Sequence, residues 1–312
     1  MPYDVCSEIY HTHMISLIFS LPLSLINGFV TETDPHKPII CSLVCHRDVP
    51  FLVCCLLSYY FFSRQNNPCV IIDDGSLTKT DKTLLKKIVS DCKIISIYTI
   101  TRNYQTNPLI QRFRRINSKS SGLVKKLIAI QYLNQKSDLI FFDADVFFRK
   151  TPNKIIEWQK EKLFPMYSTH PVNNSLYISD ADQAWLIIWQ MFISKYNTNI
   201  DFFYNSGVLC LPQKTVNQSR TNTVINYLES VGLASTWCLE QFTLSVHIFS
   251  QNNAVSLGEK YISVRTFREG VKYILNQSTI AVHYSHKSNK HFFLLWFILL
   301  IYPKILLNKR FK

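Results

Sequence analysis

The sequence predicts an α/β fold, a mostly parallel β-sheet flanked by helices on both faces. Two observations lead to this fold class. Short apolar segments rich in β-branched residues alternate along the chain with longer segments whose apolar residues recur at helical spacing. Several of the short segments also end in acidic or polar residues, which is typical of strand ends that border a ligand crevice. Regular alternation of strand and helix favours parallel strands with helices on either side.

The first elements form a β-α-β unit. The stretch 38–48, PIICSLVCHRD, is a β-branched and cysteine-rich run that ends in polar residues, so we expect a strand there. The apolar stretch 49–62 is expected to form a helix, and CVIIDDGS at 69–76 is expected to form the second strand.

The same alternation continues to position 148. Apolar residues at helical spacing predict a helix at 79–92, and KIISIYTI at 93–100 predicts a third strand. An amphipathic helix at 121–135 leads directly into LIFFDADVFF at 139–148. This last segment has the composition of a buried strand, but two carboxylates interrupt it.

The size and charge of the chain limit the classes of partner. Its 312 residues, 47% of them hydrophobic, are enough for one large core or two small ones. The formal net charge of +13 favours anionic partners. Basic residues between 102 and 126 occur without one acidic residue and could offset the charge of a bound diphosphate. They do not form a recognisable module with interleaved aromatic residues, so no nucleic-acid partner is expected.

Apolar segments lie at both ends of the chain. We expect an N-terminal apolar extension at 1–34, one α/β domain at 35–290, and a basic and apolar tail at 291–312. The stretch 14–30 lacks the basic start and the cleavage site of a signal peptide. The eleven uninterrupted apolar residues at 292–302 fall short of the ~20 that cross a bilayer.

The basic tail leaves two interpretations open. No acidic residue follows Glu269, so the tail could lie as a helix on an anionic membrane surface, or it could pack on the core of the domain. The nine cysteines include no CxxC pair, and we interpret them as reduced thiols of a cytoplasmic protein. Peripheral membrane contact through the terminal segments stays open.

The carboxylates of Asp143 and Asp145 need an explanation, because burying an unpaired carboxylate is costly. If strand pairing ends near Phe142, the i, i+2 spacing sends both side chains to the same side at the carboxyl edge of the sheet. Hard oxygen ligands of this kind favour Mg²⁺ or Mn²⁺, which share their coordination shell with phosphate oxygens. The alternative is that one aspartate caps the following turn and the other is solvated.

Polar groups follow two other predicted strands. Asp73 and Asp74 end the second strand, where their carboxylates can accept hydrogen bonds from the ribose or base of a nucleoside, although an Asp-Gly turn is an alternative. The stretch 203–208, FYNSGV, combines an amide, a hydroxyl and a glycine. In a chain with only 7 glycines, Gly207 suggests close backbone approach or a positive φ, and a strand-end turn is the alternative.

Taken in order, these motifs resemble the nucleotide-sugar-dependent glycosyltransferases of the GT-A fold, in particular family-8-like members. The resemblance spans roughly 38–290 and rests on this series: CHRD, DDGS, VKK, FFDADVFF, YNSG, WCLEQ and VHYSHK. The last motif departs from the His-Phe-x-Gly-x-x-Lys pattern of the family.

The resemblance implies a metal site and a nucleoside contact. Asp143, Asp145 and the late His283 would bind Mn²⁺ or Mg²⁺, which holds the diphosphate of a nucleoside-diphosphate-sugar donor. The acidic residue that contacts the nucleoside would be Asp74 or Asp73. Manganese or magnesium and the nucleotide sugar are therefore the expected cofactor and donor substrate.

The resemblance also implies contacts with the donor. The helix lysine that contacts the donor would be Lys125 or Lys126. Asn205, Ser206 and Gly207 match the N-S-G segment that lies beside the sugar in the family.

The implied reaction is the transfer of a sugar to an acceptor hydroxyl on a glycan, a lipid or another molecule. Glu240 could deprotonate the acceptor, as a carboxylate does in inverting enzymes, or Gln241 could lie near the anomeric centre, as amides do in retaining ones. Glu240 could instead be an ordinary residue of a helix N-terminus. His46, Arg47 and Asp48 could line the nucleotide pocket or form a salt bridge within a loop.

Two other classes of function compete with this interpretation. Paired aspartates at a strand end also serve nucleotidyl-transfer and phosphoryl-transfer enzymes that depend on Mg²⁺. A basic, membrane-peripheral binding protein could instead carry these carboxylates for structural reasons. Neither rival requires an N-S-G segment followed by an E-Q pair, so the ordered series favours the sugar transferase.

Overall fold

The computed structural model arranges the chain around one mixed sheet. It describes residues 32–103, 108–113, 121–169, 204–232, 238–251, 253–264 and 267–284, together with single positions at 30, 190, 194, 303 and 304. Within these residues the sheet has ten strands in the order β3-β2-β1-β4-β7-β6-β9-β10-β5, and β8 pairs with β6.

The strands are β1 Ile39–Val44, β2 Cys69–Asp73, β3 Lys93–Ser96, β4 Leu139–Phe142, β5 Val146–Phe148, β6 Met166–Thr169, β7 Tyr204–Leu211, β8 Val255–Ser256, β9 Tyr261–Val264 and β10 Ala281–Tyr284. The helices are η2 His46–Asp48, α2 Val49–Ser63, α3 Lys79–Ile88, α4 Ile97–Asn103, α5 Pro108–Phe113, α6 Ser121–Asn134, α7 Asn153–Glu161, α9 Gln218–Ser230, α10 Cys238–Phe249 and α11 Phe267–Leu275.

The sheet is mostly parallel, as the sequence predicts. Strands β3, β2, β1 and β4 run parallel to one another, so their carboxyl ends share one edge. Strand β7 is antiparallel to both β4 and β6, and β5 is antiparallel to β10. These antiparallel strands bring the second half of the chain against the parallel half.

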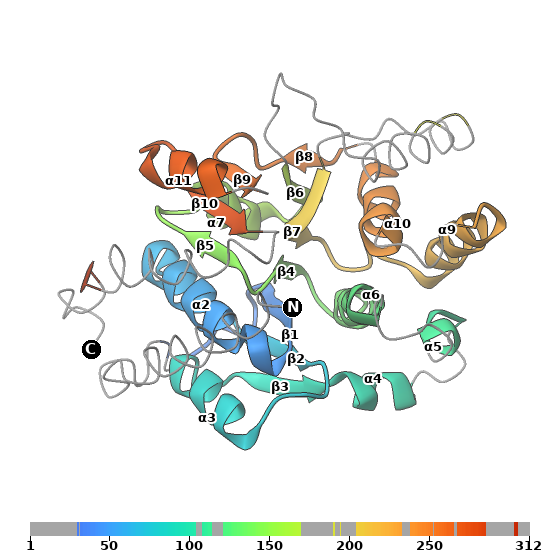
Figure 1. The fold of residues 1–312 in the computed structure, drawn as a ribbon, viewed down its shortest axis with the longest axis horizontal. Coiled ribbons are helices and arrows are strands. Elements are labelled where there is room, and N and C mark those ends of the chain that lie inside the picture. The colour runs from blue at the N-terminus through green and yellow to red at the C-terminus, as the bar shows by residue number, and fades with distance from the viewer. Residues whose placement is uncertain are drawn as a thin grey trace, which may run out of the picture.

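Two hydrophobic cores cover the two faces of the sheet, and the strand alternation assigns residues to them. Ile140 and Phe142 of β4 pack into the core that contains α2, whereas Leu139 and Phe141 pack into the core that contains α6. In Figure 1, α2 and α11 lie on one side of the sheet and α6, α9 and α10 lie on the other. Residues buried on both faces explain why these strands are apolar throughout.

Three predicted strands are shorter in the structure than expected. The segment 93–100 is a strand only to Ser96, because Ile97, Ile100 and Thr101 are buried at helical spacing on α4. The segment 69–76 ends as a strand at Asp73, where the chain turns.

The third shortened strand is the segment 139–148, which divides into β4 and β5. Strand β4 pairs with β1 and β7, whereas β5 pairs with β10 at the far end of the strand order. The predicted helix at 79–92 ends at Ile88, and Val89 bridges to Val30 instead.

The apolar terminal segments fall mostly outside the described residues. The stretch at 1–29 and the stretch at 292–302 are both among the undescribed positions. In the part of the chain that the structure does describe, no helix is long and apolar enough to span a bilayer. Seven cysteines whose side chains the structure describes carry free thiols.

One histidine is fully buried between α9 and α10. Nε2 of His247 lies 2.9 Å from Oγ1 of Thr221, and that hydroxyl donates its hydrogen to the carbonyl oxygen of Asn217. Nε2 must therefore donate, which leaves Nδ1 without a proton and without a hydrogen-bond partner among the described residues. Burial, followed by the positive charge of Arg220, lowers the pKa of His247 to about 3.

We predict that His247 weakens the fold in acid. Its pKa is about 3 in the folded protein and about 6.5 in the unfolded chain, so the unfolded chain takes up the proton first. The contribution of His247 to the free energy of unfolding is complete above pH 6.5. It is lost as the pH falls toward 3, at up to ~1.4 kcal/mol per pH unit.

Urea unfolding between pH 4 and 8 measures this dependence of the unfolding free energy on pH. The variant His247→Leu should flatten it, whereas His36→Gln, at an exposed histidine, should not. An equal slope in His247→Leu would contradict the assignment.

Candidate active site

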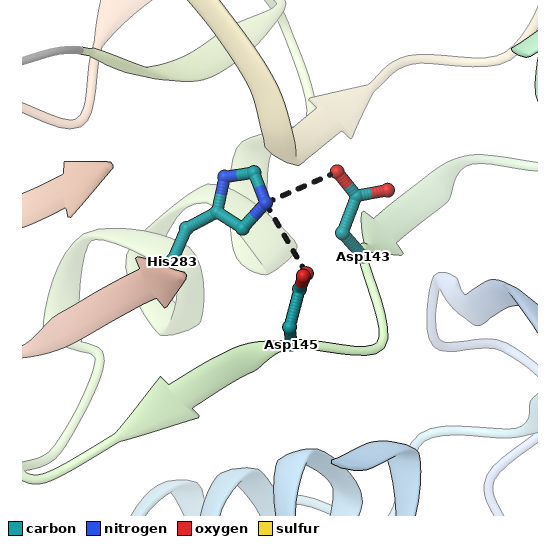
Figure 2. A group of neighbouring side chains, drawn as sticks. All are labelled: Asp143, Asp145 and His283. Atoms are coloured by element: carbon teal, nitrogen blue, oxygen red, sulfur yellow. Dashed lines mark ion pairs between the residues drawn. The ribbon is translucent and has the colours of Figure 1, made fainter. Parts of the chain in front are cut away.

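The two aspartates of the D-x-D motif lie where the chain leaves β4 for β5. The backbone N–H of Asp143 donates to the carbonyl oxygen of Gly207 (2.9 Å), and the N–H of Val146 closes the turn on the carbonyl of Asp143 (3.2 Å). Both carboxylates turn toward His283 of β10, as Figure 2 shows. Nε2 of His283 lies 3.4 Å from Oδ2 of Asp143 and 3.2 Å from Oδ1 of Asp145.

These three side chains could hold a metal ion. One ligand atom from each of Asp143, Asp145 and His283 lies within 4.8 Å of the others. An ion bound about 2.1 Å from each of two adjacent octahedral ligands separates those ligands by about 3 Å, close to the observed distances. Two carboxylates and an imidazole suit Mn²⁺, and the carboxylates also suit Mg²⁺. The residues present therefore fit the ion that the sequence predicts.

Gly207 allows His283 to occupy this position. A Cβ atom at Gly207 would lie 2.2 Å from Nδ1 of His283, so only glycine leaves room for the ring. Gly207 is not among the glycines with positive φ. Close approach, rather than backbone conformation, is the reason for glycine here.

A buried lysine joins Asp143 of the metal site to Glu240. Nζ of Lys126 lies 2.9 Å from Oδ1 of Asp143, 3.0 Å from Oγ of Ser206 and 3.3 Å from Oε1 of Glu240. Lys126 is 6% exposed and Glu240 is 2% exposed. Residues from α6, from the turn after β4 and from α10, which are distant in the sequence, thus meet at one ammonium group.

The charges around this lysine shift two pKa values. Burial raises the pKa of Glu240, and the negative charge of Asp143 raises it further, while Lys126 opposes both effects. Burial alone would lower the pKa of Lys126, yet Asp143 and Glu240 together raise it above its ordinary value. Lys126 is therefore a permanent cation in this site.

The adjacent lysine points to a different part of the same sheet edge. Nζ of Lys125 donates to the carbonyl oxygen of Asp74 (2.9 Å) and lies 3.8 Å from its Oδ2. Successive residues of a helix point about 100° apart, so α6 directs Lys126 to the metal-site carboxylates and Lys125 to the end of β2.

The two acids at the end of β2 have different surroundings. Oδ1 of Asp73 accepts hydrogen bonds from the N–H groups of Gly75 (2.7 Å) and Leu77 (3.2 Å), and Oδ2 pairs with Lys82 (2.8 Å). Burial opposes ionisation of Asp73, but Lys82 and these N–H groups lower its pKa below the usual value. Asp73 thus stabilises the turn. Oδ1 of Asp74 accepts hydrogen bonds from the N–H (3.0 Å) and the hydroxyl (2.6 Å) of Ser76, and the Asp74 side chain is about a quarter exposed.

Tyr98 lies at the same edge of the sheet, and the sequence did not predict this position. It follows β3 in the first turn of α4 and is 56% exposed. Its ring lies against Gly75, because a Cβ there would come 2.4 Å from Cε2 of Tyr98. The only signal in the sequence was an aromatic residue shortly after a strand end, and the expected longer strand at 93–100 concealed it.

The residues after β1 contact the segment that follows β2 and one another. The backbone N–H of His46 donates to Oγ of Ser76 (2.8 Å), and Nδ1 of His46 lies 2.7 Å from Oδ2 of Asp81. Arg47 pairs with Asp48 (3.5 Å), as the loop salt-bridge interpretation expects.

The predicted E-Q pair separates in space. Glu240 lies in the first turn of α10, and its carboxylate also contacts Lys126. It is therefore both a residue of a helix N-terminus and a neighbour of the candidate metal site. Nε2 of Gln241 instead donates to the carbonyl oxygen of Tyr204 (2.8 Å). Asn205 and Ser206 both lie on β7, where Asn205 contacts His283 and Ser206 contacts Lys126.

Comparison with known proteins identifies the fold. No protein-family model matches the chain, and no curated protein is similar to it in sequence. Many solved structures are similar in fold, among them three glycosyltransferases. Mouse xyloside xylosyltransferase 1 in its apo form is 12% identical, with 80% of this chain and 97% of that one covered and a TM-score of 0.50.

The other two are more weakly related in sequence. The galactosyltransferase LgtC, in complex with donor and acceptor sugar analogs, is 10% identical over 84% of this chain and 94% of that one, with a TM-score of 0.51. The glycosyltransferase GlyE of Streptococcus pneumoniae is 10% identical over 89% of this chain and 63% of that one, with a TM-score of 0.52. At these identities the likeness shows the fold, which is of the GT-A type.

We predict that Gly207→Ala weakens metal binding. The added methyl group displaces the ring of His283, because its position lies 2.2 Å from Nδ1. Mn²⁺ affinity, measured by electron paramagnetic resonance of the free ion, should fall by about 10-fold or more. Gly122→Ala is the matched control, since nothing lies within 4 Å of a Cβ at that position. Unchanged Mn²⁺ affinity in Gly207→Ala would show that His283 is not a ligand.

Proposed function

We propose that this chain is a metal-dependent, family-8-like glycosyltransferase, which moves a sugar from a nucleoside-diphosphate sugar to an acceptor hydroxyl. The convergence of Asp143, Asp145 and His283 on one point, beside the buried Lys126, carries this proposal. The carboxyl edge of parallel strands is where α/β sheets bind nucleotides.

The metal site has a defined place in this proposal. Asp143, Asp145 and His283 would hold Mn²⁺ or Mg²⁺. When bound, such an ion stabilises the negative charge that develops on a departing nucleoside diphosphate. Lys126 orients Asp143, because its ammonium group lies within 3.1 Å of both carboxylate oxygens.

The nucleoside would lie over the ends of β1, β2 and β3. Neighbouring strands lie about 4.8 Å apart, so the end of β2 is about 10 Å from the end of β4 and β3 is one strand further. An extended nucleoside diphosphate can bridge these positions. Asp74 offers a partly exposed carboxylate to the ribose, and Tyr98 offers an exposed ring face to the base.

Glu240 is the better placed of the E-Q pair to contact a bound sugar. Its carboxylate faces Lys126 beside the metal site, whereas the amide of Gln241 is bonded to the backbone of β7. Its pairing with Lys126 holds Glu240 in place and favours a role in orienting the sugar. The anomeric configuration of the product, determined by NMR, distinguishes this role from that of a base in an inverting reaction.

The structural comparisons support the proposal at the level of fold. By their names, two of the similar structures transfer xylose and galactose, and one was solved with donor and acceptor analogs. One fold can host several chemistries, so the residues of the site carry the assignment. We propose a glycan as the acceptor. A lipid acceptor and membrane contact through the terminal segments remain predictions.

A panel of nucleotide sugars tests the proposed function. We expect Mn²⁺-dependent hydrolysis of at least one nucleoside-diphosphate sugar, accelerated by a glycan acceptor. Hydrolysis of nucleoside triphosphates but of no nucleotide sugar would instead indicate a phosphoryl-transfer enzyme. No metal-dependent nucleotide binding would indicate a binding protein.

We predict that Asp143→Asn abolishes most of the activity on that nucleotide sugar. The substitution removes a metal ligand and the main charged partner of Lys126, and the metal contributes several kcal/mol to catalysis. The rate should fall by at least ~100-fold, since each 1.36 kcal/mol corresponds to a factor of ten. Glu259→Gln, at an exposed position remote in sequence, is the control and should keep the parent rate. A mutant that retains the parent rate would rule out the metal site.

We also predict that Tyr98→Ala weakens binding of the nucleoside diphosphate. Stacking of a base on an aromatic side chain contributes about 1–3 kcal/mol, so affinity should fall by about 5- to 150-fold. Tyr98→Phe keeps the ring and should bind as the parent does. Isothermal titration calorimetry in the presence of Mn²⁺ measures the difference. Equal affinity of the alanine and phenylalanine variants would place the base elsewhere.

A further inference from the structure

We propose that Asn205 is a positioning residue for the metal site, which fixes the tautomer and the orientation of His283. The proposal rests on the metal site of the proposed function. It gives Asn205 a task different from the sugar contact that the sequence resemblance implies. Contacts among β6, β7, β9 and β10, together with those of His283 with the two aspartates, carry the argument.

The first step identifies which atom of the Asn205 amide faces His283. The backbone N–H of Gly207 lies 2.9 Å from the atom assigned as Oδ1 of Asn205. A backbone N–H can only donate, so that atom must be the carbonyl oxygen rather than the amide nitrogen. Oγ of Ser168 lies 3.3 Å from the same oxygen, which suits a hydroxyl donor.

The second step identifies the tautomer of His283. Oδ1 of Asn205 can only accept, and it lies 2.9 Å from Nδ1 of His283. Nδ1 must therefore carry a hydrogen. Oγ of Ser263 lies 3.3 Å from the same nitrogen and offers a second acceptor. In a neutral imidazole the other nitrogen, Nε2, then holds the lone pair.

The third step concerns the surroundings of that lone pair. Nε2 faces carboxylate oxygens of Asp143 and Asp145 at 3.4 and 3.2 Å. Lone pairs that converge in this way repel one another unless a cation lies among them. The tautomer that Asn205 selects is thus the one that ligates a metal, and hydrogen bonding of the second nitrogen commonly orients metal-bound histidine.

Gly207 links both parts of this arrangement. Its N–H orients the amide of Asn205, and its missing side chain leaves room for the ring of His283. The segment Asn205-Ser206-Gly207 therefore serves the metal site from one strand. Ser206, between them, contacts Lys126.

Substitution of Asn205 in the full chain tests the proposal, with Mn²⁺ binding measured by electron paramagnetic resonance. Asn205→Leu has a similar size but no acceptor, and we expect Mn²⁺ affinity to fall by about 10- to 100-fold. Asn205→Asp keeps an acceptor oxygen for both Nδ1 and the N–H of Gly207, so it should bind Mn²⁺ at least as tightly as the parent. Parent-like Mn²⁺ affinity in Asn205→Leu would overturn the proposal.

A double-mutant cycle shows whether Asn205 acts through His283. In a His283→Ala background, Asn205→Leu should cause no further loss of Mn²⁺ affinity, because the ring that it positions is gone. An equal loss in both backgrounds would mean a general structural role and would overturn the proposal. Circular dichroism of each variant confirms folding.

A measurement on the parent chain does not depend on any variant. Long-range ¹⁵N NMR correlation of the metal-free protein should show a proton on Nδ1 of His283. A neutral ring protonated only on Nε2 would overturn the proposal. Mn²⁺ binding that depends on Asn205, together with no turnover of any nucleotide sugar, would support this inference and reject the proposed function. No Mn²⁺ binding by the parent would reject the positioning role.

Discussion

The pairing of two carboxylates, those of Asp143 and Glu240, with one buried lysine is the constraint on which the site depends. Asp143 and Glu240 share the ammonium group of Lys126, and Asp145 joins Asp143 in facing His283. Buried charges are tolerated only when they are paired and hydrogen-bonded. Lys126 balances one of the three negative charges, and a divalent ion held by the aspartates and His283 would balance the other two. The two aspartates and His283 thus fit a divalent cation.

The fold places these charges together by dividing the apolar segment 139–148 into two strands that pair with different neighbours. Strand β4 continues the parallel half of the sheet, while β5 joins β10 and so carries Asp145 to His283. Antiparallel β7 runs beside β4 and delivers Asn205, Ser206 and Gly207 to the same place. Side chains from α6, the β4–β5 turn, β7, α10 and β10 therefore meet, although these elements are far apart in the sequence.

The aspartates of the D-x-D motif and Tyr98 show how much of the site could be predicted from the sequence. The alternation of strand and helix predicts the sheet and its flanking helices, and the D-x-D spacing predicts two carboxylates on one side. The prediction reached that result through an extended strand, whereas the aspartates lie in a turn. Tyr98 was hidden for a related reason, since burial of Ile97 and Ile100 turns the expected strand into helix α4. Local propensity is weak where tertiary packing selects the conformation.

The sequence by itself determined the α/β class, the order of the motifs and the chemical types of the candidate ligands, because these follow from local periodicity and composition. Only the tertiary structure decided that Lys126 rather than Lys125 reaches the metal-site carboxylates, and that Asn205 turns to His283. These contacts join residues far apart in sequence. They depend on how the helices and strands pack and on which side-chain rotamers that packing allows. Local sequence patterns determine neither the packing nor the rotamers.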